Sequence, residues 1–163
     1  MKILITGGKS ATALKLVKAF DTYQVVLADY GEVPSFISKA YSLISLGAKN
    51  EDTLAHNLLN KCLDEGIDLL LPIHHFEIEA VAKAKTLFNE FNIQILLPNR
   101  KELDQYFNIE NSYKADDWVV FRAGEIIFTT NNEVISKDTN QKNLNGAFYH
   151  IKDDKTQFKL ITI

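Results

Sequence analysis

The most constraining feature of this sequence is a short apolar run, Ile3 to Thr6, that ends in Gly7-Gly8 and leads directly into a helical pattern. A continuous apolar run of this length predicts a strand buried on both faces, as in the middle of a parallel sheet. From Ser10 to Phe20 apolar residues recur at helical spacing, and Ser10 is placed to cap that helix. We therefore expect a strand, a tight glycine turn and a crossover helix at the start of the chain.

The same alternation continues to about residue 107. Further strands are expected at Gln24–Ala28, Leu43–Leu46, Ile67–Pro72 and Ile93–Leu97, and helices at Pro34–Ala40, Glu51–Glu65, Ile78–Phe91 and Lys101–Phe107. Strands and helices that alternate over short connections require right-handed crossovers and a parallel sheet covered on both faces. The expected fold class is α/β, with a doubly wound, mostly parallel, Rossmann-like sheet in residues 1–110.

The character of the sequence changes after about Asn111. Five β-rich runs follow, at Trp118–Arg122, Glu125–Thr130, Glu133–Lys137, Ala147–Lys152 and Gln157–Ile163. They are separated by Ala123-Gly124, Asn131-Asn132 and Asp153-Asp154-Lys155, and such residues favour hairpin turns. We expect an antiparallel β appendage over residues 111–163. So thin a layer must bury its apolar face, either on the α/β half or in a homodimer, and we favour the homodimer.

Composition excludes several classes of partner. Eighteen basic and 21 acidic residues among 163 give a formal net charge of −3, and no Lys/Arg cluster is present to attract nucleic acid or an anionic membrane. The single cysteine, Cys62, has no second cysteine for a disulfide or a zinc site. The first apolar run is too short for a signal peptide or a membrane span. We expect a cytoplasmic protein without a metal site.

The glycine turn lies where a dinucleotide-binding fold keeps its phosphate loop. Gly7, Gly8, Lys9 and Ser10 are therefore candidate ligand-binding residues, and Asp29, 22 residues after Gly7, matches an acidic residue that binds a ribose. Ala11 and Ala13 stand where further glycines belong, and the adjacent glycines do not form a Walker loop. ATP or NAD(P) are the candidate cofactors, and none is required. The alternative is a structural turn with Asp29 capping a loop.

A second polar group follows the fourth expected strand. His74, His75 and Glu77 fall at the carboxyl edge of the sheet, where open α/β sheets bind ligands. They could bind a carboxylate or exchange protons near neutral pH. The alternative is a polar loop in which Glu77 starts the next helix. No catalytic set can be assembled from the sequence, so catalytic residues are left unassigned.

Four segments together resemble the N-terminal domain that precedes the ATP-grasp domain in carbamoyl-phosphate synthase large chains, biotin carboxylases and related carboxylate–amine ligases. They are Lys2–Phe20, Val26–Asp29, Gly66–Glu77 and Ile93–Pro98, and the likeness covers about residues 1–107. The resemblance implies a pre-ATP-grasp fold. In that family an Asp/Asn-Lys pair opens the catalytic domain, but Phe107–Asn111 has no lysine. The expectation is that the ATP-grasp catalytic domain is absent.

Three functions follow as hypotheses. The first is a free-standing pre-ATP-grasp-like domain that acts as a ligand-binding or accessory module, partner of a separately encoded ATP-grasp ligase and not catalytic alone. The second is a small NAD(P)- or nucleotide-binding enzyme, although no Tyr-x-x-x-Lys pair follows Tyr41 or Tyr106. The third is a structural or dimerisation protein that acts through its β region.

Overall fold

The chain divides into two units. The computed structural model describes residues 1–107, 117–132, 143–151 and 157–163. Unit 1 comprises Met1–Ile95 together with Thr162–Ile163, and unit 2 comprises Leu96–Ile161. Each is described by itself below. The expected division at residues 110 and 111 falls in the stretch 108–116, outside the described residues.

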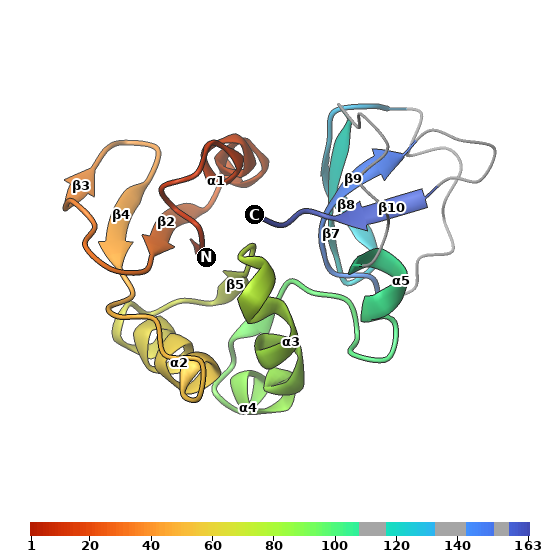
Figure 1. Cartoon of the computed structure of the whole chain (residues 1–163). Coiled ribbons are helices and arrows are strands. Elements are labelled where there is room, and N and C mark those ends of the chain that lie inside the picture. The colour runs from red at the N-terminus through yellow and green to blue at the C-terminus, as the bar shows by residue number, and fades with distance from the viewer. Residues whose placement is uncertain (108–116, 133–142, 152–156) are drawn as a thin grey trace. The chain divides into compact units, whose positions relative to one another are not determined.

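Unit 1 is built on a six-stranded mixed sheet, most of whose strands are parallel (Figure 1). Across the sheet the strands are β3 (Phe36–Ile37), β4 (Ser42–Ser45), β2 (Gln24–Asp29), β1 (Lys2–Ile5), β5 (Leu69–Leu71) and β6 (Gln94–Ile95). All neighbours pair in parallel except β3 and β4. The chain adds strands on one side of β1 and then crosses to the other side. The expected α/β class, with a mostly parallel sheet and a separate antiparallel sheet, is confirmed.

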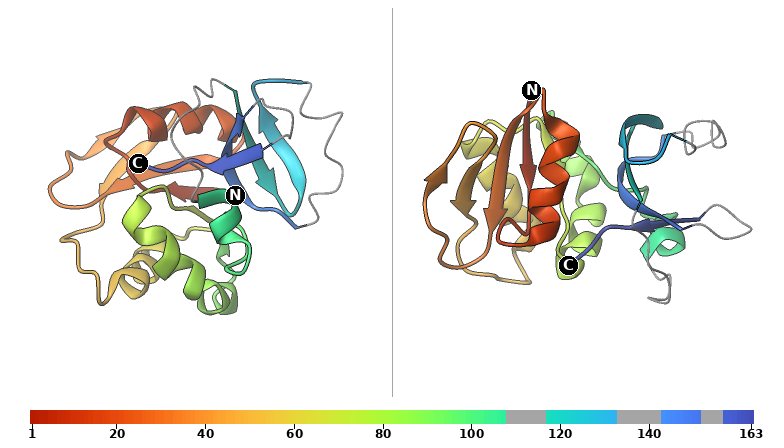
Figure 2. Two further views of the ribbon diagram at one scale, coloured as in Figure 1. Left: turned by 45° about the vertical axis from the view of Figure 1, so that its right-hand side comes forward. Right: turned by 90° about the horizontal axis from the view of Figure 1, so that it is seen from above.

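Helices cover both faces of this sheet, which is why its central strands are apolar throughout. They are α1 (Ala11–Leu16, continued by the 3₁₀ turn Val17–Phe20), α2 (Leu54–Asp64), α3 (His75–Lys83) and α4 (Lys85–Glu90). Figures 1 and 2 show α1 on one face and α2, α3 and α4 on the other. As expected, Ser10 caps α1: its hydroxyl accepts from the Ala13 N–H at 3.0 Å. Cys62 lies on the buried stripe of α2 with no exposed surface.

The helix expected at Pro34–Ala40 is wrong, because this segment carries the edge strand β3. The side chain of Ser38 accepts from the N–H groups of Ala40 and Tyr41, and the Ser38 N–H donates to the Tyr41 carbonyl at 2.9 Å. A serine that bonds its neighbours' backbone in this way competes with helix formation. Phe36 and Ile37 remain extended and pair with β4.

The helix expected at Ile78–Phe91 begins earlier and is interrupted. It starts at His75, because the Glu77 carboxylate accepts from the His74 N–H at 3.2 Å and so satisfies the first turn. It divides at Ala84, whose N–H donates to the carbonyls of both Ala80 and Val81. The residues before α3, Ile73 and His74, are not usual helix-capping types. Sequence alone therefore places the start of this helix too late.

Unit 2 is a four-stranded antiparallel sheet with one short helix. Its order is β10 (Gln157–Leu160), β9 (Gly146–Ile151), β7 (Trp118–Arg122) and β8 (Glu125–Thr129), and the helix is α5 (Leu103–Phe107). Ala123-Gly124 forms the expected tight turn with positive φ at both residues. The core includes edge-to-face contacts among Phe121, Phe148 and Phe158. The strand expected at Glu133–Lys137 and the turn at 153–155 lie outside the described residues, and the homodimer stays a prediction.

Within the described ranges, no helix is both long and apolar enough to cross a bilayer.

Gly66 ends α2 with a positive φ of 63°, a conformation that costs an L residue about 1–2 kcal/mol. A Cβ at this position would meet no heavy atom within 4 Å, so the cost is confined to the backbone. We expect Gly66→Ala to lower the free energy of unfolding by about 1–2 kcal/mol, and Gly66→Asn to cost less because asparagine tolerates this conformation. Urea titration followed by circular dichroism measures both. Equal stability of wild type and Gly66→Ala would contradict the prediction.

Candidate functional site

The carboxyl ends of β1, β2 and β5 bring a set of polar side chains to one edge of the sheet. Thr6 follows β1, Asp29 ends β2 and is followed by Tyr30, and His74 and Glu77 follow β5. Because parallel strands end at the same edge, residues far apart in sequence meet here. Of the residues predicted from sequence, Asp29, His74 and Glu77 belong to this cluster.

Glu77 is fully buried and has a donor on each carboxylate oxygen. Its Oε1 accepts from the hydroxyl of Thr6 and from the His74 N–H, and its Oε2 accepts from the Tyr30 hydroxyl at 2.9 Å. Burial raises the pKa of Glu77 above its usual value, and the hydrogen bonds from Thr6 and Tyr30 oppose this rise without cancelling it. The cluster therefore contains a carboxyl group that retains its proton to higher pH than an exposed glutamate.

Asp29 behaves in the opposite way. It is 5% exposed, its Oδ2 accepts from the Lys9 N–H at 2.9 Å, and its Oδ1 accepts from the Tyr30 N–H at 2.8 Å. Nε2 of His74 lies 3.1 Å from Oδ1. Burial alone would raise the pKa of Asp29, but the two backbone donors and His74 outweigh burial and hold it below its usual value. A carboxylate with three partners inside the protein is already satisfied without a ribose.

The glycine turn is likewise engaged within the protein. A Cβ on Gly7, whose φ is 67°, would lie 2.5 Å from Cδ1 of Ile163. A Cβ on Gly8 would lie 2.9 Å from the Ala28 nitrogen, and the Gly8 N–H donates to the Ala28 carbonyl at 2.9 Å. Close packing within unit 1 is therefore a sufficient reason for both glycines. Their role in binding a phosphate stays a prediction.

The remaining predicted residues surround this turn. Ser10 is used as the cap of α1, and Nζ of Lys9 donates to the Tyr30 carbonyl at 2.9 Å. His75 is an exposed residue whose N–H donates to the Ile163 carbonyl at 2.9 Å. The two adjacent histidines thus have different surroundings.

An aromatic group that sequence analysis missed flanks the cluster. The rings of His74 and Phe76 stack with centroids 4.8 Å apart, and Tyr30 packs against Phe76 at 5.4 Å. Nζ of Lys49 lies 4.0 Å from the centre of the Phe76 ring, within the range of a cation–π interaction. Thr6 and Tyr30 directly follow the last residues of β1 and β2, and that position is the signal that could have found them. Phe76 lies in the first turn of α3 and carries no such signal.

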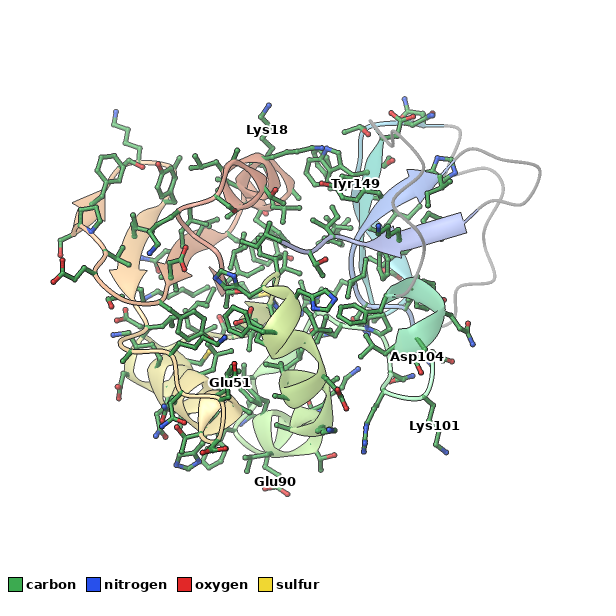
Figure 3. All side chains as sticks on the ribbon, in the orientation of Figure 1. Lys18, Glu51, Glu90, Lys101, Asp104 and Tyr149 are labelled. Atoms are coloured by element: carbon green, nitrogen blue, oxygen red, sulfur yellow. The ribbon has the colours of Figure 1, made fainter. Side chains whose placement is uncertain are left out.

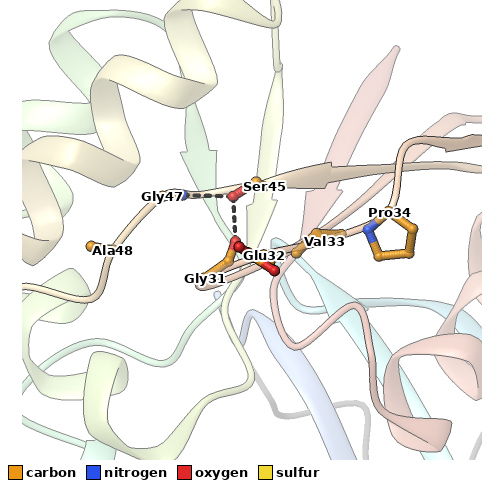
Figure 4. Close-up of a pocket in the computed structure, with 7 residues that line it drawn as sticks. All are labelled: Gly31, Glu32, Val33, Pro34, Ser45, Gly47 and Ala48. Carbon is orange, nitrogen blue, oxygen red and sulfur yellow. Dashed lines mark hydrogen bonds between the residues drawn. The ribbon is translucent and has the colours of Figure 1, made fainter.

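A pocket opens at the same edge, at the ends of β2 and β4 (Figure 4). Its volume is about 830 Å³, and it is lined by Gly31, Glu32, Val33, Pro34, Ser45, Gly47 and Ala48. The Ser45 hydroxyl donates to the Gly31 carbonyl at 2.6 Å and accepts from the Gly47 N–H at 3.0 Å. The Gly31 N–H also donates to the Gly47 carbonyl at 2.8 Å. The Ser45 hydroxyl and the backbone therefore together join the two loops that form the pocket.

In the described parts of the chain no three His, Cys, Asp or Glu side chains are grouped to hold a metal ion. Figure 3 shows charged side chains such as Lys18 and Glu90 projecting away from the elements that carry them.

Neither a family model nor a curated protein matches the chain.

The raised pKa of Glu77 makes stability depend on pH. Because the folded state holds the proton more tightly than the unfolded state, this contribution is complete in acid and is lost as pH rises from about 4 through the folded pKa. Relative to Glu77→Gln, the wild type should lose stability over that range, by about 1.4 kcal/mol per unit of pKa difference. Urea unfolding at several pH values tests this. The exposed Glu90→Gln serves as the control in the same series, and a flat difference for Glu77→Gln would contradict the prediction.

Asp29 should give the opposite dependence. Its lowered pKa stabilises the fold above the usual aspartate pKa, and this contribution is lost as pH falls through the folded value. Asp29→Asn should cost about 1.5–3 kcal/mol at neutral pH, since a charged hydrogen-bond acceptor is removed, and markedly less in acid. The exposed Asp21→Asn serves as the matched control in the same unfolding series. A cost for Asp29→Asn that grows toward acid pH would refute this assignment.

Proposed function

We propose that the chain is a ligand-binding module whose unit 1 is a Rossmann-like half-domain of the pre-ATP-grasp type. The strand order supports this proposal: β4, β2, β1, β5 and β6 lie side by side, and the chain reverses its direction of progress at β1. Doubly wound sheets bind ligands along the carboxyl edge near such a reversal. Here the reversal itself, between β1 and β5, holds the hydrogen-bonded cluster around Glu77, and the open pocket lies farther along the same edge. The order of strands and helices agrees with the resemblance of residues 1–107.

The observation that carries the binding function is the position of the pocket. It lies at the carboxyl ends of β2 and β4, on the edge where open α/β sheets bind their ligands. By contrast, the Gly8 and Lys9 N–H groups and the Asp29 oxygens are occupied by bonds within the protein. The ligand therefore binds beside the glycine turn, over β2 and β4.

The lining of the pocket favours a flat ring with polar edges. Gly31, Gly47 and Ala48 leave space for a ring, Val33 and Pro34 supply apolar surface, and the exposed Glu32 can accept from amino or hydroxyl groups. Nζ of Lys9 bonds the carbonyl of Tyr30, which precedes Gly31, and Lys49 follows Ala48, so both bring positive charge near the pocket for a phosphate. Lys49 is also paired with Glu51 at 2.8 Å. The ligand class that fits is a nucleotide of the adenosine type. On the resemblance, the proposed module works together with an ATP-grasp ligase.

Calorimetric titration with AMP, ATP and NAD⁺ tests this function. Ala48→Phe fills the pocket with a side chain outside the core, and we expect it to weaken nucleotide binding at least about tenfold, the equivalent of roughly 1.4 kcal/mol. Ala40→Phe is the matched control, because Ala40 is also exposed but does not line the pocket. An absence of heat with all three compounds would rule out the nucleotide ligand. Equal affinity of Ala48→Phe and Ala40→Phe would show that the pocket is not the binding site.

A further inference from the structure

Thr162 and Ile163 belong to unit 1, although the residues before them belong to unit 2. The Ile163 N–H donates to the Ile73 carbonyl at 2.8 Å, and the Ile163 carbonyl accepts from the His75 N–H at 2.9 Å. Two such bonds are the β-type pairing of one extended residue with a neighbouring segment of chain. The pair of residues, which we call the strap, thus lies along the segment that leads from β5 into α3.

The side chain of Ile163 fits against the glycine turn. A Cβ added to Gly7 would lie 2.5 Å from Cδ1 of Ile163 and 3.0 Å from Cγ1 of Ile73. Gly7, Ile73 and the backbone of His75 together form a socket for one aliphatic residue. The space that a dinucleotide fold leaves open for a ligand at this turn is filled by the protein's own chain.

The contacts that hold the strap against unit 1 are weak enough for the strap to come off without unfolding of the sheet. Ile163 remains 40% exposed, so docking removes only part of its apolar surface from water. Its two hydrogen bonds can be replaced by bonds to water, and docking must order two residues of backbone. The free energy gained from burial and hydrogen bonding is similar in size to the entropy lost in ordering these residues. The docked strap therefore opens locally without unfolding of the sheet.

Release of the strap bears directly on the candidate site. Ile73 and His75 flank His74, whose ring pairs with Asp29 and whose N–H donates to Glu77. Two residues before Ile163, the Ile161 N–H donates to the Ala147 carbonyl in the antiparallel sheet. We propose that the strap docks reversibly in the socket and that docking orders His74 and its partners, which makes the strap a regulatory element of the candidate site.

Amide hydrogen exchange tests the proposal without any ligand, so its outcome is independent of the proposed nucleotide. In the wild type, the His75 amide should exchange faster than the amides of Leu4 and Leu70 in the sheet. Its exchange should also depend little on low concentrations of urea, as local opening requires. Equal protection and equal urea dependence at all three positions would show that the segment opens only with the whole sheet, and the proposal would fail.

A size series at the strap tests the socket and its coupling. His75 exchange should rise from wild type to Ile163→Val and again to Ile163→Ala, by about tenfold overall if roughly 1.4 kcal/mol of docking energy is lost. The amides of Lys9 and Tyr30, which donate to Asp29, should follow in the same order. Thr162→Ala is the matched control and should resemble the wild type, while Leu4 and Leu70 report on the intact sheet. No response of His75 to the series would overturn the socket, and no response of Lys9 and Tyr30 would overturn its coupling to the site.

Discussion

The carboxyl group of Glu77 ties together the ends of three parallel strands. It accepts from Thr6 after β1, from Tyr30 after β2, and from the backbone of His74 after β5. A buried polar group without partners is costly, so each member of this arrangement depends on the others. Thr6 is held in turn by the Ile73 N–H, which donates to its hydroxyl at 2.8 Å. The start of α3, the turn after β1 and the end of β2 are therefore fixed as one assembly.

This assembly divides the carboxyl edge into two parts. Between β1, β2 and β5 the polar groups satisfy one another, and Ile163 covers Gly7. Beyond β2, toward β4, the loops are joined through Ser45 but leave open space between them. A ligand can enter the second part without breaking a buried hydrogen bond. The structural task of this edge and the proposed binding task thus fall to neighbouring but different residues.

Local sequence patterns were sufficient for most of the architecture. The buried apolar runs at β1, β2 and β5, the Ser10 cap and the positive-φ glycine after α2 are all short-range signals, and each has its physical cause within a few residues. The errors occurred where partners are distant or unusual. Ser38 turned an expected helix into an edge strand through side-chain bonds, and His74 became a helix cap through Glu77.

The site was predictable only in part, because its hydrogen bonds join residues far apart in sequence. Asp29 ends β2, and His74 and Glu77 follow β5, so these three could be identified by position. The link of Glu77 to Thr6 spans 71 residues, and that to Tyr30 spans 47, so no local pattern reveals them. Gly7 and Gly8 were correctly read as a tight turn, but the contact that fills the space beside Gly7 comes from Ile163.

The buried cysteine of α2 has a consequence for how the motions of this protein can be observed. Burial raises the pKa of the Cys62 thiol to about 12, so the closed helix presents almost none of the thiolate that reacts with alkylating reagents. Because Cys62 is the single cysteine of the chain, any alkylation reports on one place alone. The rate at which Cys62 is alkylated therefore reports how often α2 opens locally and exposes this thiol to solvent.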